Sequence, residues 1–137
     1  MMDMMPYLMP LVAMLTLMAC DPRAAQIMPT AQEAQAAQYK GVQTRLLDQD
    51  LINLRVRMSD VTSRYELTEY ADCAAAQYTL IRGYLFAQHV RTNFSRQNGD
   101  WLADSVYVIR PNLPDGPKKL DAEVVVAACT DNAIPTV

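Results

Sequence analysis

A regular alternation of apolar and polar side chains marks the stretch from Leu51 to Met58. From Ile52 onward, apolar residues fall on every second position, and the positions between them hold Asn53, Arg55 and Arg57. Successive side chains of a strand point to opposite faces, so a period of two predicts a strand with one buried and one solvated face. The buried face needs a covering layer, and the chain is therefore expected to build a sheet packed on one side.

A helix is expected directly after this strand. Ser59 or Asp60 has the side chain of an N-cap, and apolar residues then recur at helical spacing to about Ala76. The helix end is open at this stage, because the chain as far as Gly83 can also be helical. Many residues on the apolar face are alanines, which lets the helix lie close on a sheet, and Cys73 borders that face.

The second half of the chain reads as strands and turns. The segment from Tyr78 to about Phe94 is rich in β-forming residues, and Gly83 within it suggests a bulge. The later elements are a two-residue turn at Asn98-Gly99, a return strand Trp101 to Ile109, a loop Pro111 to Pro117 and a last strand Leu120 to Cys129. The order β-α-β-β-β predicts an α+β fold, with one helix packed on a curved antiparallel sheet of about four strands.

The N-terminus carries a different signal. An almost wholly apolar run from Tyr7 ends in Leu17-Met18-Ala19-Cys20, and its length suits a signal peptide better than a membrane-spanning helix. The motif resembles the lipobox of a bacterial lipoprotein precursor. The resemblance implies that residues 1–19 are a signal peptide, that Cys20 carries lipid, and that the protein is anchored to a membrane of the cell envelope, facing the periplasm. The alternative is a chance cysteine after a core helix, although Asp21-Pro22 would break that helix.

The segment that follows Cys20 is rich in alanine and glutamine and has no wide apolar face. We therefore expect residues 20–45 to form a tether and residues 46–137 to form the domain. A short helix starting near Thr30 is the alternative, since Thr30 to Glu33 has the spacing of a capping box.

Three cysteines leave an odd count. If Cys20 carries lipid, Cys73 and Cys129 remain as a pair, and an exported compartment permits their oxidation to a disulfide. Two unrelated buried thiols are the alternative. The 12 lysines and arginines against 15 aspartates and glutamates give no basic excess, so no nucleic-acid partner is expected.

No catalytic, metal-binding or phosphate-binding motif stands out, and we expect no cofactor and no metal. His89, the single histidine, is a candidate general base with Ser95 or Asp104 nearby, and a strand residue at the solvent edge is the alternative. Arg55 and Arg57 share a solvated face and are candidate binding residues. An ordinary solvated face and binding at the loop Pro111 to Pro117 are the alternatives. The sequence therefore favours a non-catalytic binding or assembly module, with an envelope protein as its partner. A small envelope hydrolase centred on His89 is the second hypothesis.

Overall fold

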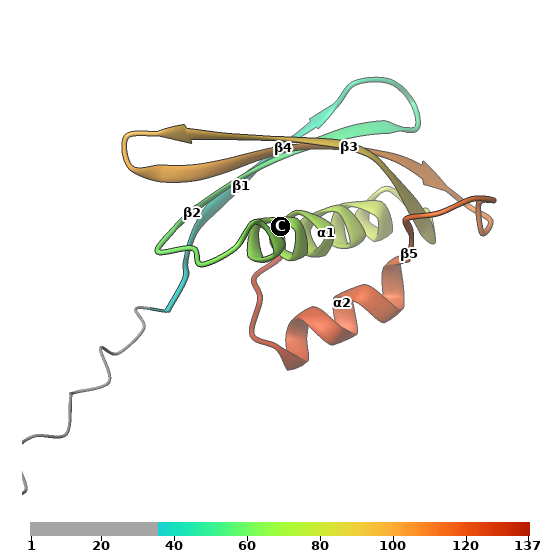
Figure 1. Ribbon diagram of the computed structural model, residues 1–137. Coiled ribbons are helices and arrows are strands. Elements are labelled where there is room, and N and C mark those ends of the chain that lie inside the picture. Colours follow the sequence, from blue (N-terminus) through green and yellow to red (C-terminus); the bar gives the residue numbers. More distant parts are fainter. Residues whose placement is uncertain (1–35) are drawn as a thin grey trace, which may run out of the picture. The chain divides into compact units, whose positions relative to one another are not determined.

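The computed structural model describes residues 36–137, and Figure 1 shows the arrangement of their elements. They form five strands and two helices: β1 (Gln38–Leu46), β2 (Leu51–Ser59), α1 (Arg64–Ile81), β3 (Phe86–Gln97), β4 (Asp100–Arg110), β5 (Lys119–Asp121) and α2 (Ala122–Asp131). The strands make one antiparallel sheet in the order β1-β2-β4-β3-β5. The expected fold class, an α+β domain with a curved antiparallel sheet, is confirmed.

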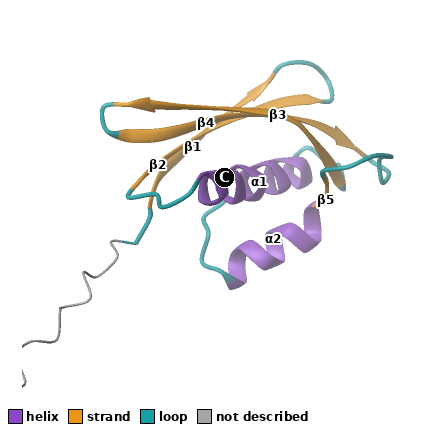
Figure 2. Ribbon diagram, in the orientation of Figure 1, coloured by secondary structure: helices purple, strands orange, loops and turns teal. Residues whose placement is uncertain are grey.

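Both helices lie on the same side of the curved sheet (Figure 2). α1 runs beneath the central strands, and α2 packs against α1 and the end of β5. The opposite face of the sheet carries no helix among the described elements. No helix in residues 36–137 is long and apolar enough to cross a membrane.

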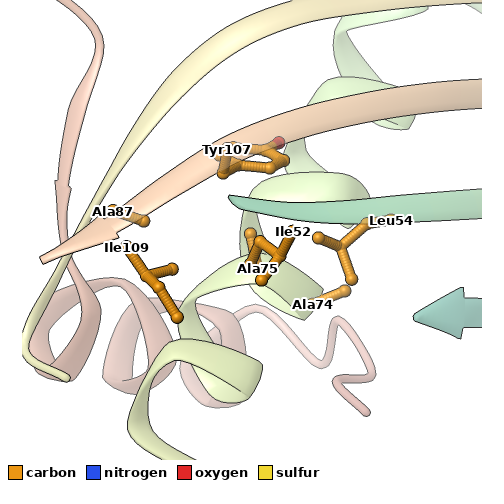
Figure 3. Close-up of a cluster of buried hydrophobic side chains, with 7 residues drawn as sticks. All are labelled: Ile52, Leu54, Ala74, Ala75, Ala87, Tyr107 and Ile109. Atoms are coloured by element: carbon orange, nitrogen blue, oxygen red, sulfur yellow. The ribbon is translucent and has the colours of Figure 1, made fainter. Parts of the chain in front are cut away.

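The alternation in β2 has the predicted consequence. Ile52, Leu54, Val56 and Met58 are fully buried, and they pack against the alanine-rich face of α1. Figure 3 shows one half of this core, in which Ala74 and Ala75 of α1 meet side chains of β2 and β4. Because alanine is small, the helix axis can approach the sheet closely, as the sequence predicts.

The ends of α1 differ from the expected ones. Asp60 has a positive φ of 55°, so the chain turns there, and the helix starts only at Arg64. At the other end, Gly83 N–H donates to the carbonyl of Leu80, and Tyr84 N–H donates to the carbonyl of Thr79. This pair of bonds is a Schellman motif, which needs a residue with positive φ at the position of Gly83. Gly83 therefore ends the helix, and its assignment to a bulge was wrong.

The hairpin between β3 and β4 is confirmed. Asn98 and Gly99 have φ values of 53° and 84°, as a two-residue turn of this kind requires. A bulge does occur in β3, but at Val90, between His89 and Arg91. Before the bulge the odd-numbered His89 faces the helices, and after it the even-numbered Thr92 does, because each lies opposite a buried residue of β4.

Two element assignments are corrected. Leu120 to Cys129 is not a strand: β5 stops at Asp121, whose carboxylate accepts from Val124 N–H and caps α2. The run of three valines favours a strand by local preference, but the cap and the packing on α1 outweigh it. Residues 38–45 were expected in the tether, yet together with Leu46 they form β1 and complete one edge of the sheet. The signal peptide, Cys20 and residues 20–35 lie outside the described residues.

Candidate functional site

The predicted disulfide between Cys73 and Cys129 is present. The Cα atoms lie 6.0 Å apart, and both residues are buried. We expected the bond to join the helix to the last strand; it joins α1 to α2 instead, because Cys129 is helical. The bond therefore fixes the outer helix to the helix that covers the sheet.

The helix-free face of the sheet gathers charged side chains on neighbouring strands. Arg55 on β2 lies opposite Asp104 on β4, with 3.4 Å between Arg55 Nε and Asp104 Oδ2. The other oxygen of Asp104 lies 3.5 Å from Arg91 Nη1. Asp100 pairs in the same way with Lys40 at 3.0 Å and with Arg57 at 3.7 Å. Four cations thus share two carboxylates, and the face has a positive excess.

A depression of about 440 Å³ lies on this face, over β1 and β2. It opens where Gly41 has no side chain, at a break in the pairing of β1 with β2. Its rim carries three cations and two amide side chains, namely Lys40, Arg55, Arg57, Gln43 and Gln97. Arg57 also donates a hydrogen bond of 3.1 Å to Gln97 Oε1. The two arginine side chains keep 44% and 42% of their surface exposed, so a partner can reach them.

The ion pairs of this surface are easily exchanged. Exposed pairs contribute little to stability, about 0–1 kcal/mol each, because water screens the charges and two long side chains must be held still. An incoming carboxylate can therefore replace Asp104, whose side chain is 34% exposed, as the partner of Arg55 without a large cost. The surface around Gly41 has the chemistry of an anion-recognition site.

A second hollow, of about 570 Å³, lies on the helix side of the sheet, between α1 and β3. Its lining combines polar and apolar residues from three elements and the loop before β5: Thr68, Asp72, His89, Arg91, Thr92, Phe94, Lys118 and Leu120. A hollow of this size is within the range of small-molecule sites, about 300–1,000 Å³.

Two sets of side-chain hydrogen bonds connect the lining of the hollow to β4. Tyr107, fully buried on β4, donates its hydroxyl to Asp72 Oδ1 at 2.7 Å. Thr92 Oγ1 lies 2.7 Å from His89 Nε2 and 2.7 Å from Ser105 Oγ. These bonds hold the side chains of α1 and β3 in fixed orientations, so the polar wall of the hollow is preformed.

The surroundings shift the proton affinity of these groups. Burial raises the pKa of the Asp72 carboxyl, while the hydrogen bond from Tyr107 acts in the opposite direction. Burial and the carboxyl of Asp72 hold the pKa of Tyr107 well above its usual range. Burial also lowers the pKa of His89, and the charge of Lys118 lowers it further. Neutral imidazole is thus favoured beside a cationic lysine.

The structure does not assemble the hydrolase set considered from the sequence. His89 faces the helices, whereas Asp104 pairs with Arg55 and Arg91 on the other face. Ser95 lies opposite Leu102, on the same face as Asp104. The serine that His89 reaches through Thr92 is Ser105, which is fully buried, so a substrate carbonyl cannot approach its hydroxyl.

Sequence reasoning found Arg55 and Arg57 but missed Lys40 and Gly41 beside them, and Asp72 in the second hollow. Lys40 and Gly41 were assigned to the tether, and their strand was not recognised. Asp72 was passed over, although an acidic residue between the apolar positions Ala71 and Cys73 is a usable signal for a buried carboxyl. In residues 36–137, no three histidine, cysteine or acidic side chains gather as a metal site would require.

Comparison with known proteins gives a family. Residues 39–133, well over half of the chain, match the model of the YNQ4 C-terminal domain. The chain belongs to this family. The match runs from the first strand of the YNQ4 C-terminal domain through α2, and so includes both hollows.

One curated relative is an uncharacterized 26.9 kDa protein in nqo8 5'region, from Paracoccus denitrificans. It is 23% identical over 114 residues, which cover 79% of this chain and 45% of the relative. The chain thus spans less than half the length of that relative. No solved structure matches the chain significantly.

Proposed function

We propose that the chain is a lipid-anchored protein of the cell envelope whose domain binds an acidic segment of a partner protein and catalyses no reaction. The observation that carries the binding proposal is the cluster of Lys40, Arg55 and Arg57 around the depression at Gly41. Charged groups arranged around a concave surface give a partner both attraction and a defined orientation.

The lipid anchor rests on the run Leu17-Met18-Ala19-Cys20. The Cys73–Cys129 disulfide supports export, because such bonds persist in oxidising compartments such as the periplasm. Mass spectrometry of the membrane-extracted protein is expected to find an acylated N-terminal Cys20. Cys20→Ser removes the lipid in this proposal, and an intact Met1 terminus in the wild type would refute it.

The mixed charges favour a protein partner over a fluid lipid surface. Each arginine of the cluster already has a carboxylate beside it, so the face alternates positive and negative groups at fixed spacing. Gln43 and Gln97 add hydrogen-bonding groups with defined directions. A peptide with carboxylates at fixed intervals can match such a pattern, whereas mobile headgroups respond mainly to net charge.

The binding proposal is tested by site-specific photocrosslinking in envelopes. In one variant a photoreactive residue replaces Gln43 in the depression. In a control variant of the same chain, the photoreactive residue replaces Arg82 at the end of α1. A partner captured from Gln43 and not from Arg82 is identified by mass spectrometry. Its acidic segment is then synthesised and titrated against the purified protein.

We expect Arg55→Ala with Arg57→Ala to weaken that titrated binding at least tenfold. Arg82→Ala with Lys119→Ala removes the same charge elsewhere and is expected to change it less than twofold. Equal losses in the two double variants would refute a specific site. Binding to anionic phospholipid vesicles with the same dependence on Arg55 and Arg57 would assign the face to lipid instead.

A further inference from the structure

The sheet has an open edge along most of β3, the strand that β5 covers at one end. β3 is 12 residues long, but β5 pairs only with its first three, Phe86 to Gln88. The last backbone bond on that side runs from His89 N–H to the carbonyl of Lys118. From Arg91 to Gln97, β3 has β4 as its partner and no second strand among the described residues. Figure 1 shows β5 as a short strand at one end of β3.

The hollow of about 570 Å³ lies where a longer β5 would have run. Thr68 and Asp72 of α1 line it from the helix side, and Phe94 lines it from the open part of β3. Lys118 and Leu120 line it from the point where β5 begins. The space is therefore what remains between the sheet edge and the helix because β5 is short. A strand added to β3 would cover it.

The polar groups of the hollow favour a ligand with both an anionic group and a hydrogen-bond donor. Lys118 takes part in none of the ion pairs found in the described part of the chain, and its charge reaches His89. An anionic group is therefore favourable beside Lys118. On the other side, the one recorded donor to Asp72 is Tyr107, which bonds Oδ1. A carboxyl oxygen of Asp72 remains available to accept from a ligand N–H or O–H group.

We propose that the open edge of β3 and the hollow beside it bind an extended peptide that carries a carboxylate. The peptide backbone pairs with β3 between Arg91 and Gln97 as an added strand, its carboxylate meets Lys118, and an apolar side chain packs on Phe94 and Leu120. Strand addition supplies main-chain hydrogen bonds, and a pocket beside the edge supplies selectivity. This site lies on the opposite face from the cluster at Gly41 and does not depend on the proposed function.

The carboxylate has two sources, the C-terminus of a peptide or an acidic side chain within it. Both present the same group to Lys118. An isolated small anion fits less well, because it would leave the edge of β3 unpaired and offer no N–H donor to Asp72.

The test selects randomised heptapeptides on the immobilised full chain, from one library with free C-termini and one with a blocked C-terminus. We expect enrichment of sequences that alternate apolar and polar residues and carry a carboxylate. Enrichment in the free library alone assigns the C-terminus, and enrichment in both assigns an acidic side chain. No enrichment in either library would overturn the proposal.

The best peptide is then titrated against ¹⁵N-labelled protein. Amide signals of residues 91–97 and of Lys118 are expected to shift. Lys118→Met is expected to weaken binding at least tenfold, and Thr68→Phe, which fills the hollow from α1, is expected to weaken it as strongly. Lys119→Met is the matched control, since it removes the adjacent charge outside the hollow, and it should change the affinity less than twofold.

Shifts confined to β1, the other open edge of the sheet, would overturn the assignment. Equal effects of Lys118→Met and Lys119→Met would do so as well. Arg55→Ala with Arg57→Ala should leave peptide binding unchanged, so a failure here is distinguishable from a failure of the site at Gly41.

Discussion

Removing the Cys73–Cys129 disulfide is expected to destabilise the domain strongly, with the largest local effect on α2. The two cysteines are separated by 56 residues, and the chain-entropy model gives about 4 kcal/mol for a closed loop of that length. α2 has little else to hold it, because Ala122 and Cys129 are its two buried residues. Without the bond, α2 should detach from α1 well before the sheet unfolds.

The experiment compares the protein with its Cys73→Ala, Cys129→Ala double variant, both carrying Cys20→Ser to avoid mispairing. Urea unfolding should show a loss of about 4 kcal/mol in the free energy of unfolding. Hydrogen exchange should show the largest loss of protection in residues 122–131. Amides of β2 and β4 that exchange through global unfolding should lose protection only by the amount of the global loss. A loss below about 1 kcal/mol, or unchanged protection of α2, would contradict this account. Reducing the parent protein should reproduce the variant.

Three further predictions concern the buried carboxyl of Asp72, the apolar core and the end of α1. The pKa of Asp72 is raised above its ordinary value of 3.8, so the stability that protonation provides is complete below pH 3.8 and is lost as the pH rises through the folded-state pKa. In urea titrations, the free energy of unfolding of Asp72→Asn should therefore rise relative to that of the parent as the pH goes from 3 to 7. A difference between the two proteins that does not change with pH would contradict this prediction. Leu54→Ala should cost about 2–5 kcal/mol, since the side chain is fully buried, whereas Leu46→Ala on exposed β1 should cost far less; similar losses in thermal unfolding would refute the assigned core. Gly83→Ala should cost about 1–2 kcal/mol because of the φ of +82°, and no loss in the urea midpoint would argue against the Schellman motif.

Local pattern was sufficient for the parts of the fold in which one face is buried. β2 was predicted because its alternation is set by burial against α1, and the turn at Asn98 and Gly99 because few other residues tolerate positive φ. β1 was missed for the converse reason. Only one of its nine residues, Val42, is partly buried and the other eight are exposed, so this edge strand has no periodic apolar pattern. The predicted last strand was wrong because the preference of valine for strands is weak compared with the tertiary packing of α2 on α1.

The candidate sites depend on distances that no local pattern contains. Arg55 could be placed on a solvated face, but its carboxylate partner Asp104 lies 49 positions away and meets it only through the β2–β4 register. The bulge at Val90 also moved His89 to the helix side, away from Ser95. A single extra residue in a strand reverses which side chains share a face, and sequence periodicity alone does not locate it.

The strand order β1-β2-β4-β3-β5 has a consequence for how the domain reaches its native state. Each outer pair, β1 with β2 and β3 with β4, is a hairpin of neighbouring strands that can close within microseconds. The central pair, β2 with β4, joins residues about 50 positions apart and must enclose α1 as it forms. Joining the two hairpins over the helix is therefore the high-contact-order step, and we expect it to set the folding rate.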